Sequence, residues 1–323
     1  MRVAAIERVG APAVLKTQEM PVPVIGPHEV LIALHASGVG IWDADIRNGW
    51  WPRGQPCFPL VIGSDGAGTV AAVGTRVRRF KIGDRVWAHE FINPKGGFYA
   101  EFVAVHARNV GHVPRNLDLL HAGAAVATGL TALRGIDEVL AVRRNQMVLV
   151  YGATGAVGTL AVQFAKRRHA HVIATATGRK ARALMQRLGA DATFDARSDE
   201  AIAQLRSHAP HGLDAVIAFA GGKTLDRSLD LVRAGGRVAF PYGVEPEPKR
   251  RRRPFVIDRF DAESSPAEFK RLARAVEEAR LQVPIAAVYP LSQAARAHQR
   301  LEQGGVLGRI VLCVSKQGRR PGG

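Results

Sequence analysis

Residues 148–158 read VLVYGATGAVG, a short apolar run that closes on three evenly spaced glycines. The run is typical of a strand buried on both faces, and residues 159–168 carry apolar side chains at helical spacing. Where such a strand turns into a helix, glycines let a pyrophosphate reach the backbone, and the helix N-terminus attracts the anion. The segment therefore predicts a dinucleotide-binding turn; a turn that binds another ligand is the alternative. The candidate cofactor-binding residues of this turn are Gly152, Gly155, Ala156, Val157 and Gly158.

Strand-like and helix-like segments alternate after this turn. Such alternation predicts a doubly wound parallel sheet with helices on both faces, the Rossmann class of α/β fold. We expect strands at 172–175, 192–194, 215–218 and 237–240, and helices at 179–188, 201–208 and 225–232.

The rest of the chain has a different character. Residues 1–110 contain short β-type runs broken by Gly and Pro, and residues 288–314 return to this style. We expect residues 1–120 and 284–323 to form one mainly β domain, into which a nucleotide-binding domain of residues 121–283 is inserted. Two domains also fit a length of 323 residues. Ligands prefer the cleft between two domains, so we expect the site there.

The end of the second expected strand indicates which nicotinamide cofactor binds. An NAD site usually has an acid about 20 residues beyond the glycines, whereas the 2′-phosphate of NADPH needs cations there. The chain reads TATGRK at 175–180, without an acid. Arg179 and Lys180 would hold the phosphate, with Thr177 as a hydroxyl donor, so NADPH is the predicted cofactor. The alternative is that both cations are solvated residues of a helix's first turn.

Several stretches outside the turn resemble one family. They are ASGV (36–39), FPLVIG (58–63), GAGTV (66–70), KIGDRV (81–86), TGLTA (128–132) and the run from Gly304 to Val314. The sequence resembles the zinc-free quinone oxidoreductase (zeta-crystallin-like) branch of the medium-chain dehydrogenases/reductases. The resemblance implies a Rossmann domain inserted into a GroES-like domain, and NADPH-dependent reduction of quinones or α,β-unsaturated carbonyls. Thr128, Thr131 and Gly243 complete the candidate cofactor-binding residues.

The cysteines and histidines predict that no zinc is bound. Catalytic zinc in the alcohol dehydrogenase relatives takes Cys and His ligands, and structural zinc takes four closely spaced cysteines. This chain has only Cys57 and Cys313, and Ser64 stands where the relatives carry the histidine ligand. Residues 40–43 and 90–98 contain no cysteine either.

Without zinc, hydrogen-bond donors must steady the substrate oxygen. The resemblance points to residues 38–51, where Gly40 replaces an Asn of the relatives and Trp51 replaces a Tyr, while Asp43 and Arg47 match. An indole can donate a hydrogen bond but cannot supply a proton, so we expect hydride positioning to dominate, with Trp51 shaping an aromatic pocket. Asp43 and Arg47, four residues apart, form either a local helix ion pair or part of the catalytic site.

This arrangement favours a quinone acceptor. The reduced anion of a quinone is stable, whereas an enal or enone needs its enolate held and its α-carbon protonated. Reduction of an enal or enone double bond is the alternative. Tyr242 is a spare donor near the expected cofactor, or else a packed aromatic residue.

A strong positive charge raises a hypothesis from another class of protein. Lys and Arg exceed Asp and Glu by 45 − 28 = 17 residues, partly in the run Lys249–Arg253. Such a charge favours polyanions, so a nucleic-acid-binding protein on a reductase fold is the rival hypothesis. The run lacks the interleaved aromatic residues that stack on bases, and a solvated basic loop explains it equally.

Two cysteines, no signal peptide and no apolar stretch near the ~20 residues of a membrane span predict a cytoplasmic protein. A homodimer is common among such folds, with edge strands pairing across a two-fold axis. We expect residues 237–240 near such an edge.

Overall fold

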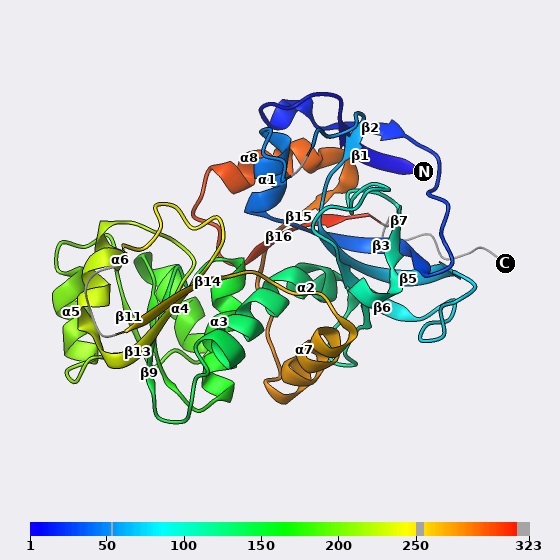
Figure 1. The fold of residues 1–323 in the computed structure, drawn as a ribbon. Coiled ribbons are helices and arrows are strands. Elements are labelled where there is room, and N and C mark those ends of the chain that lie inside the picture. The colour runs from blue at the N-terminus through cyan, green and yellow to red at the C-terminus, as the bar shows by residue number, and fades with distance from the viewer. Residues whose placement is uncertain (53, 250–254, 315–323) are drawn as a thin grey trace. The chain divides into compact units, whose positions relative to one another are not determined.

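The computed structural model describes residues 1–323 except Arg53, 250–254 and 315–323 (Figure 1). The chain divides into two compact units. Unit 1 comprises Met1–Ala127, Ser264–Ala273 and Ile285–Gly323, and unit 2 comprises Thr128–Glu263 and Arg274–Pro284. The helices α2 (Leu119–Arg134) and α7 (Pro266–Glu278) contribute residues to both units.

Unit 1 is built on two sheets. The larger has the strand order β15-β16-β3-β5-β6-β8, with β7 also paired to β3, and the smaller has the order β2-β1-β4. All pairs are antiparallel except β15 with β16. The strands are β1 (Arg2–Ile6), β2 (Lys16–Glu19), β3 (Glu29–Val39), β4 (Leu60–Val61), β5 (Asp65–Val73), β6 (Arg85–His89), β7 (Phe102–His106), β8 (Val110–His112), β15 (Ile285–Pro290) and β16 (Arg309–Cys313).

Strand β3 joins the two ends of the chain. Its Gly38 lies opposite Val311 of β16, so the C-terminal strand pairs directly with an N-terminal one. On its other side β3 pairs with β5, where a Cβ atom on Gly68 would come within 2.8 Å of the Ala33 carbonyl carbon. Only glycine permits this approach of two backbones. The helices α1 (Ile41–Arg47) and α8 (Ala294–Glu302) complete unit 1, together with short 3-10 turns at Pro12–Val14, Ala107–Asn109 and Leu291–Gln293.

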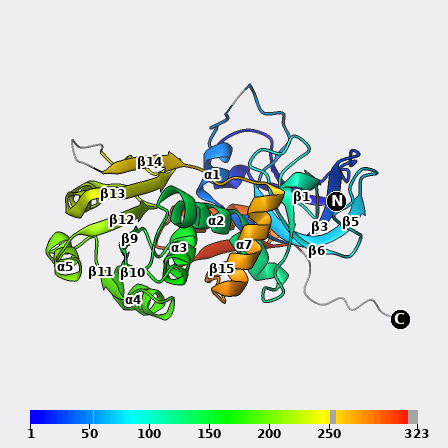
Figure 2. The same cartoon turned by 60° about the horizontal axis from the view of Figure 1, so that its bottom comes forward.

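Unit 2 contains one six-stranded sheet in the order β11-β10-β9-β12-β13-β14, and every pair in it is parallel. Figure 2 shows β13 and β14 on one side of this sheet and β10 and β11 on the other. The doubly wound α/β class expected from the sequence is confirmed. The strands are β9 (Met147–Tyr151), β10 (His171–Thr175), β11 (Ala192–Phe194), β12 (Leu213–Ala218), β13 (Val232–Pro241) and β14 (Val256–Phe260). The helices are α3 (Ala156–Arg167), α4 (Gly178–Arg187), α5 (Ala201–His208) and α6 (Lys223–Ser228), with a 3-10 turn at Leu229–Leu231.

Two expectations from the sequence are wrong in unit 2. The predicted helix 225–232 ends early, because Leu229–Leu231 is a 3-10 turn and Val232 already belongs to β13. The predicted edge strand 237–240 lies inside the sheet, because β14 pairs with it on its outer side. The sequence VIDRF of β14 contains two charged residues, so it lacks the continuous apolar run by which a buried strand is recognised.

A long apolar helix also departs from expectation. Helix α2 continues into a π-helical turn, Gly135–Val139, and Leu119–Val139 is long and apolar enough to cross a membrane. The expectation that no apolar stretch approaches that length is therefore wrong. Its most apolar window is 78% buried within the protein, as in the core helix of a soluble protein.

The basic run Lys249–Arg253 lies mostly outside the described residues. Of its five residues the structure describes Lys249 alone, whose backbone N–H donates to Asp226 Oδ1 over 3.0 Å.

Candidate functional site

The glycine turn of unit 2 is held by its neighbouring strand. Gly152 follows β9 with φ +76°, a conformation that other residues rarely adopt. Its N–H donates to Thr175 Oγ1 over 2.8 Å, and the Ala153 N–H donates to the same oxygen over 3.3 Å. The last residue of β10 therefore fixes the turn that follows β9.

The other two glycines have distinct roles. A Cβ atom on Gly158 would lie 2.6 Å from Ala153 Cα, so a side chain there would force helix and turn apart. A Cβ atom on Gly155 would meet nothing nearer than 3.6 Å. Gly155 is the N-cap of α3 and makes no side-chain cap. The first amides of α3, from Ala156 and Val157 onward, thus form a place where a phosphate can bind to the backbone.

An acid missed by the sequence analysis, Asp195, directly follows β11 and contacts Thr177, which lies just after β10. Thr177 Oγ1 donates to Asp195 Oδ1 over 2.7 Å, and the Arg197 N–H donates to the same oxygen over 3.0 Å. These hydrogen bonds, above all the one from Thr177, lower the pKa of Asp195. The Thr177 hydroxyl therefore points its proton at Asp195 and not at a phosphate. The only signal for Asp195 was its position directly after the third strand of the predicted fold.

The remaining candidate cofactor residues have varied surroundings. Arg179 and Lys180 are exposed in the first turn of α4, whereas Thr128 and Thr131 are buried on α2. Tyr242 is 55% exposed, and the guanidinium carbon of Arg259 lies 3.9 Å from the centre of its ring. Gly243 follows it with φ +84°.

In unit 1, Asp43 is the centre of a buried polar cluster. It is fully buried on α1 and accepts hydrogen bonds from the Gly40 N–H (2.8 Å), Tyr99 Oη (3.2 Å) and Ser64 Oγ (3.3 Å). Burial, and next the neighbouring Asp65, raise the pKa of Asp43 to about 7. Its bond to the Gly40 N–H caps the helix that carries it.

Arg47 does not pair with Asp43, so the interpretation as a local ion pair is wrong. Arg47 is fully buried and forms a salt bridge with Glu302 of α8. It also donates to the Gly10 carbonyl over 2.9 Å and lies 3.0 Å from His298 Nδ1. The partners are contributed by segments far along the chain, which a spacing of four residues cannot reveal.

One chain of hydrogen bonds leads from Arg47 through His298 and Tyr99 to Asp43. Arginine only donates, so His298 Nδ1 accepts from Arg47, and the ring hydrogen sits on Nε2. Nε2 lies 3.0 Å from Tyr99 Oη and donates to it, which leaves the Tyr99 hydroxyl to donate to Asp43. Burial, followed by the charge of Arg47, lowers the pKa of His298 to about 3, consistent with this neutral ring. The sequence analysis missed Tyr99 and His298.

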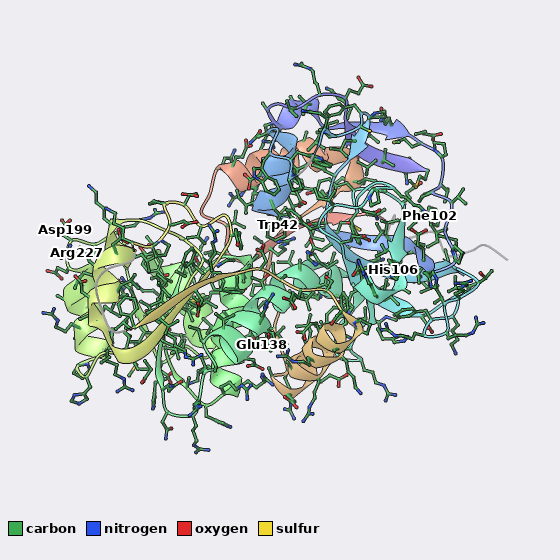
Figure 3. All side chains as sticks on the ribbon, viewed as in Figure 1. Trp42, Phe102, His106, Glu138, Asp199 and Arg227 are labelled. Atoms are coloured by element: carbon green, nitrogen blue, oxygen red, sulfur yellow. The ribbon has the colours of Figure 1, made fainter. Side chains whose placement is uncertain are left out.

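Trp42 and Arg309 form the other side of the cluster. The Trp42 indole N–H donates to Ser64 Oγ, and the guanidinium carbon of Arg309 lies 5.0 Å from the indole centre. Arg309 in turn donates to Asp65 Oδ1 over 2.8 Å, and both residues are buried. Trp42 is the second residue of α1 and is labelled in Figure 3. Trp51, the aromatic residue expected at the acceptor, is half-buried and packs against the core of unit 1.

The donor set of this cluster does not suit zinc. Ser64 both accepts from Trp42 and donates to Asp43, and Cys57 is exposed. Within the described part of the chain, no three His, Cys, Asp or Glu side chains lie close enough to share a metal ion.

The two units and their glycine turn define a class of dinucleotide-dependent enzyme, and comparison with known proteins agrees. Residues 26–115 match the family described as "Alcohol dehydrogenase GroES-like domain", and residues 188–312 match "Zinc-binding dehydrogenase". Quinone oxidoreductase of Mus musculus is 30% identical over 328 residues, covering 97% of this chain and 98% of the relative. That of Lama guanicoe is 32% identical over 326 residues, with the same coverage.

Solved structures give the same result. An NAD-dependent alcohol dehydrogenase aligns with a TM-score of 0.90 and 30% identity, covering 98% of this chain and 100% of its own. A mycobacterial protein complexed with NADPH aligns with a TM-score of 0.84 and 30% identity, covering 97% and 100%. The chain belongs to the medium-chain dehydrogenase/reductase superfamily, as its sequence motifs predicted, and it is an oxidoreductase.

Proposed function

We propose that the protein uses NADPH to reduce a quinone or a similar conjugated carbonyl, without zinc. The observation that carries the proposal is the turn at 152–158, where the uncapped end of α3 leaves room for a pyrophosphate beside Gly155. Relatives named quinone oxidoreductase and a neighbour complexed with NADPH support the reaction class. In this proposal the cofactor supplies the hydride, and the chain binds and orients both reactants.

Local charge supports NADPH over NADH. Arg179 and Lys180 begin α4, and Arg182 and Arg197 lie near Asp195 and lower its pKa. Arg182 and Arg197 therefore partly offset the charge of Asp195, and Arg179 and Lys180 are the cations proposed to hold the 2′-phosphate. Asp195 favours NADH instead, because a carboxylate at this place would repel the 2′-phosphate of NADPH and would accept a hydrogen bond from the ribose hydroxyl of NADH.

The buried cluster of unit 1 supports a quinone acceptor. The Tyr99 and Ser64 hydroxyls donate to Asp43, and the Trp42 N–H donates to Ser64. The hydroxyl and indole donors of this cluster are already engaged with one another and with Asp43, whereas an enal needs protonation at carbon. We assign Asp43 and Arg47 to positioning α1 and its neighbours, and Trp51 to the wall of the acceptor pocket. Tyr242 is the remaining candidate donor.

We also propose a cytoplasmic homodimer. Within the described residues β14 is one of the two edge strands of the unit 2 sheet, and Val256 in it is 53% exposed. Such an edge strand is suited to pairing with a second copy.

The test is a rate comparison of NADPH oxidation with 1,4-naphthoquinone and with trans-2-hexenal, in the presence of a strong chelator. We expect kcat/KM for the quinone to exceed that for the enal by at least about 10²-fold, since only the enal needs an acid. A preference for the enal would establish double-bond reduction instead, and loss of activity with the chelator would contradict the zinc-free mechanism.

A further inference from the structure

Unit 2 contains a cavity of about 240 Å³ away from its glycine turn. The lining comes from the loop before β9, the start of β12 and the first half of β13. Gln146 in this lining directly precedes β9, whereas Gly152 of the turn directly follows that strand. A strand of five residues spans about 16 Å, so the cavity and the turn lie at opposite edges of the parallel sheet.

The cavity borders a bulge in the sheet. Between two regular pairings of β12 with β13, residues 233–236 of β13 lie opposite the single residue Asp214 of β12. Gly235 in this bulge has φ +75°, and a Cβ atom on Gly236 would lie 2.9 Å from the Arg233 carbonyl oxygen. Glycine thus permits a backbone path that other residues would hinder. Bulges redirect side chains and are common beside functional sites.

Cations outnumber acids in the cavity. Among the described residues that line it, Asp214 is the one acid, and the cations are Arg143, Arg233 and Arg237. Arg233 forms an ion pair with Asp214, which also accepts the Met147 N–H over 2.7 Å. The carboxylate is therefore already neutralised, and the positive charges of Arg143 and Arg237 have no counter-charge in the lining.

These two guanidinium groups have donors to spare. Arg143 binds Gln146 Oε1 through its backbone N–H over 2.8 Å, and its guanidinium group has no hydrogen-bond or ion-pair partner within the described part of the chain. Arg237 donates from Nη1 to the Val139 carbonyl over 3.2 Å, which leaves its other N–H groups to a ligand. Both residues are exposed, so a ligand can reach them from solvent. Guanidinium groups bind phosphate oxygens through paired hydrogen bonds, so two of them in one cavity suit a dianion.

The volume of the cavity limits the size of the ligand. One water takes about 30 Å³ of the liquid, so the cavity holds about eight such volumes. A phosphate group fills only part of that space and leaves room for a short attached chain. Ligands of drug size occupy pockets of about 300–1,000 Å³, which this cavity does not reach.

We propose that this cavity binds a phosphate dianion, either inorganic phosphate or the head of a small phosphorylated molecule, through Arg143 and Arg237. The ion pair of Arg233 with Asp214 belongs to the wall of the site. The inference goes beyond the proposed function, because a ligand at this edge of the sheet does not touch the glycine turn and takes no part in hydride transfer.

The test is isothermal titration calorimetry of the full chain at pH 8, where phosphate carries its second charge. Inorganic phosphate and glycerol 3-phosphate are titrated separately into the wild type, Arg143→Gln and Arg144→Gln. Arg144→Gln is the matched control, because Arg144 is the exposed neighbour of Arg143 and lies outside the lining. We expect a Kd of about 1 mM for the wild type and the control, and binding at least about 10-fold weaker in Arg143→Gln.

A second variant tests the site without removing an arginine. Ala234 is exposed in the bulge and lines the cavity, so Ala234→Glu brings a carboxylate beside the two guanidinium groups. It should weaken phosphate at least about 10-fold. Fluorescence titration of the same variants should give an unchanged Kd for NADPH, because the cofactor turn lies at the other edge of the sheet.

The two ligands distinguish the source of the phosphate. Tighter binding of glycerol 3-phosphate identifies a small phosphorylated molecule, and equal affinities identify inorganic phosphate. The inference is overturned if neither ligand saturates the wild type at about ten times the expected Kd, or if Arg143→Gln and Arg144→Gln behave alike. Loss of NADPH binding together with phosphate binding would also overturn it. Failure to reduce a quinone would overturn the proposed function alone.

Discussion

At the scale of single residues, the charges around the cofactor turn come from separate elements. Arg179 and Lys180 lie in the first turn of α4. Asp195 directly follows β11 and accepts a hydrogen bond from Thr177. We infer that the balance between these cations and Asp195 sets the preference between NADPH and NADH.

The first prediction is that Arg179→Ala with Lys180→Ala weakens NADPH much more than NADH. Each charge-assisted bond to the phosphate contributes ~1.5–3 kcal/mol, so the Kd of NADPH should rise by at least about 10-fold per cation. Fluorescence titration with each cofactor measures the effect. Arg187→Ala with Lys270→Ala is the matched control, because both cations are exposed, Arg187 is at the opposite end of α4 and Lys270 is on α7. Equal losses for the two cofactors would show that Arg179 and Lys180 do not contact the 2′-phosphate.

At the scale of elements, the two glycines at the start of α3 have different surroundings. The backbone of Ala153 lies against Gly158, whereas Gly155 has ordinary contacts only. We therefore infer that Gly158 is needed for the close approach of the neighbouring backbone and that Gly155 is needed for the approach of the cofactor.

The second prediction follows from this difference. Gly158→Ala should lower the free energy of unfolding by about 1–3 kcal/mol, because the neighbour is backbone and cannot turn aside. Gly155→Ala should leave the stability within about 0.5 kcal/mol but weaken NADPH, since its methyl group occupies the approach to the amides. Urea unfolding and cofactor titration of both variants measure these effects. Equal stability of the two variants would contradict the assigned roles.

At the scale of the whole molecule, buried ionisable groups couple stability to pH. Burial lowers the pKa of His298 to about 3 and that of His89 to about 4, both from 6.5. Their contribution to stability is complete above pH 6.5 and is lost as the pH falls, because the unfolded chain takes up the protons first. Burial raises the pKa of Asp43 from 3.8 to about 7, so its contribution is lost as the pH rises between these values. Burial likewise raises the pKa of Asp45, Asp65, Glu90 and Asp261, so these carboxyl groups oppose the histidines.

The third prediction is that His298→Gln makes the slope of the free energy of unfolding against pH less positive between about pH 4.5 and 6.5. One group contributes at most about 1.4 kcal/mol per pH unit. Urea unfolding across this range measures the slope, with the exposed His208→Gln as control. A His298→Gln profile parallel to that of the wild type would show that His298 titrates normally in the folded protein.

The sequence by itself determined the alternating elements of unit 2, the glycine turn and the superfamily, because these depend on local periodicity and on residues adjacent in the chain. The bounds of α5, 201–208, agree with the prediction in full. The domain boundaries and the roles of the candidate site residues stay predictions.

Only the tertiary structure decided the partners of the buried charges. Arg47 meets Glu302 across 255 positions and Arg309 meets Asp65 across 244, although the sequence suggested that Arg47 pairs with Asp43 four residues away. No local pattern encodes such pairs, because burial excludes water, and each charge takes whichever opposite group the folded strands and helices bring within reach. The same holds for Trp42, whose indole lies where a side chain at position 40 would be and donates to a hydroxyl 22 positions away.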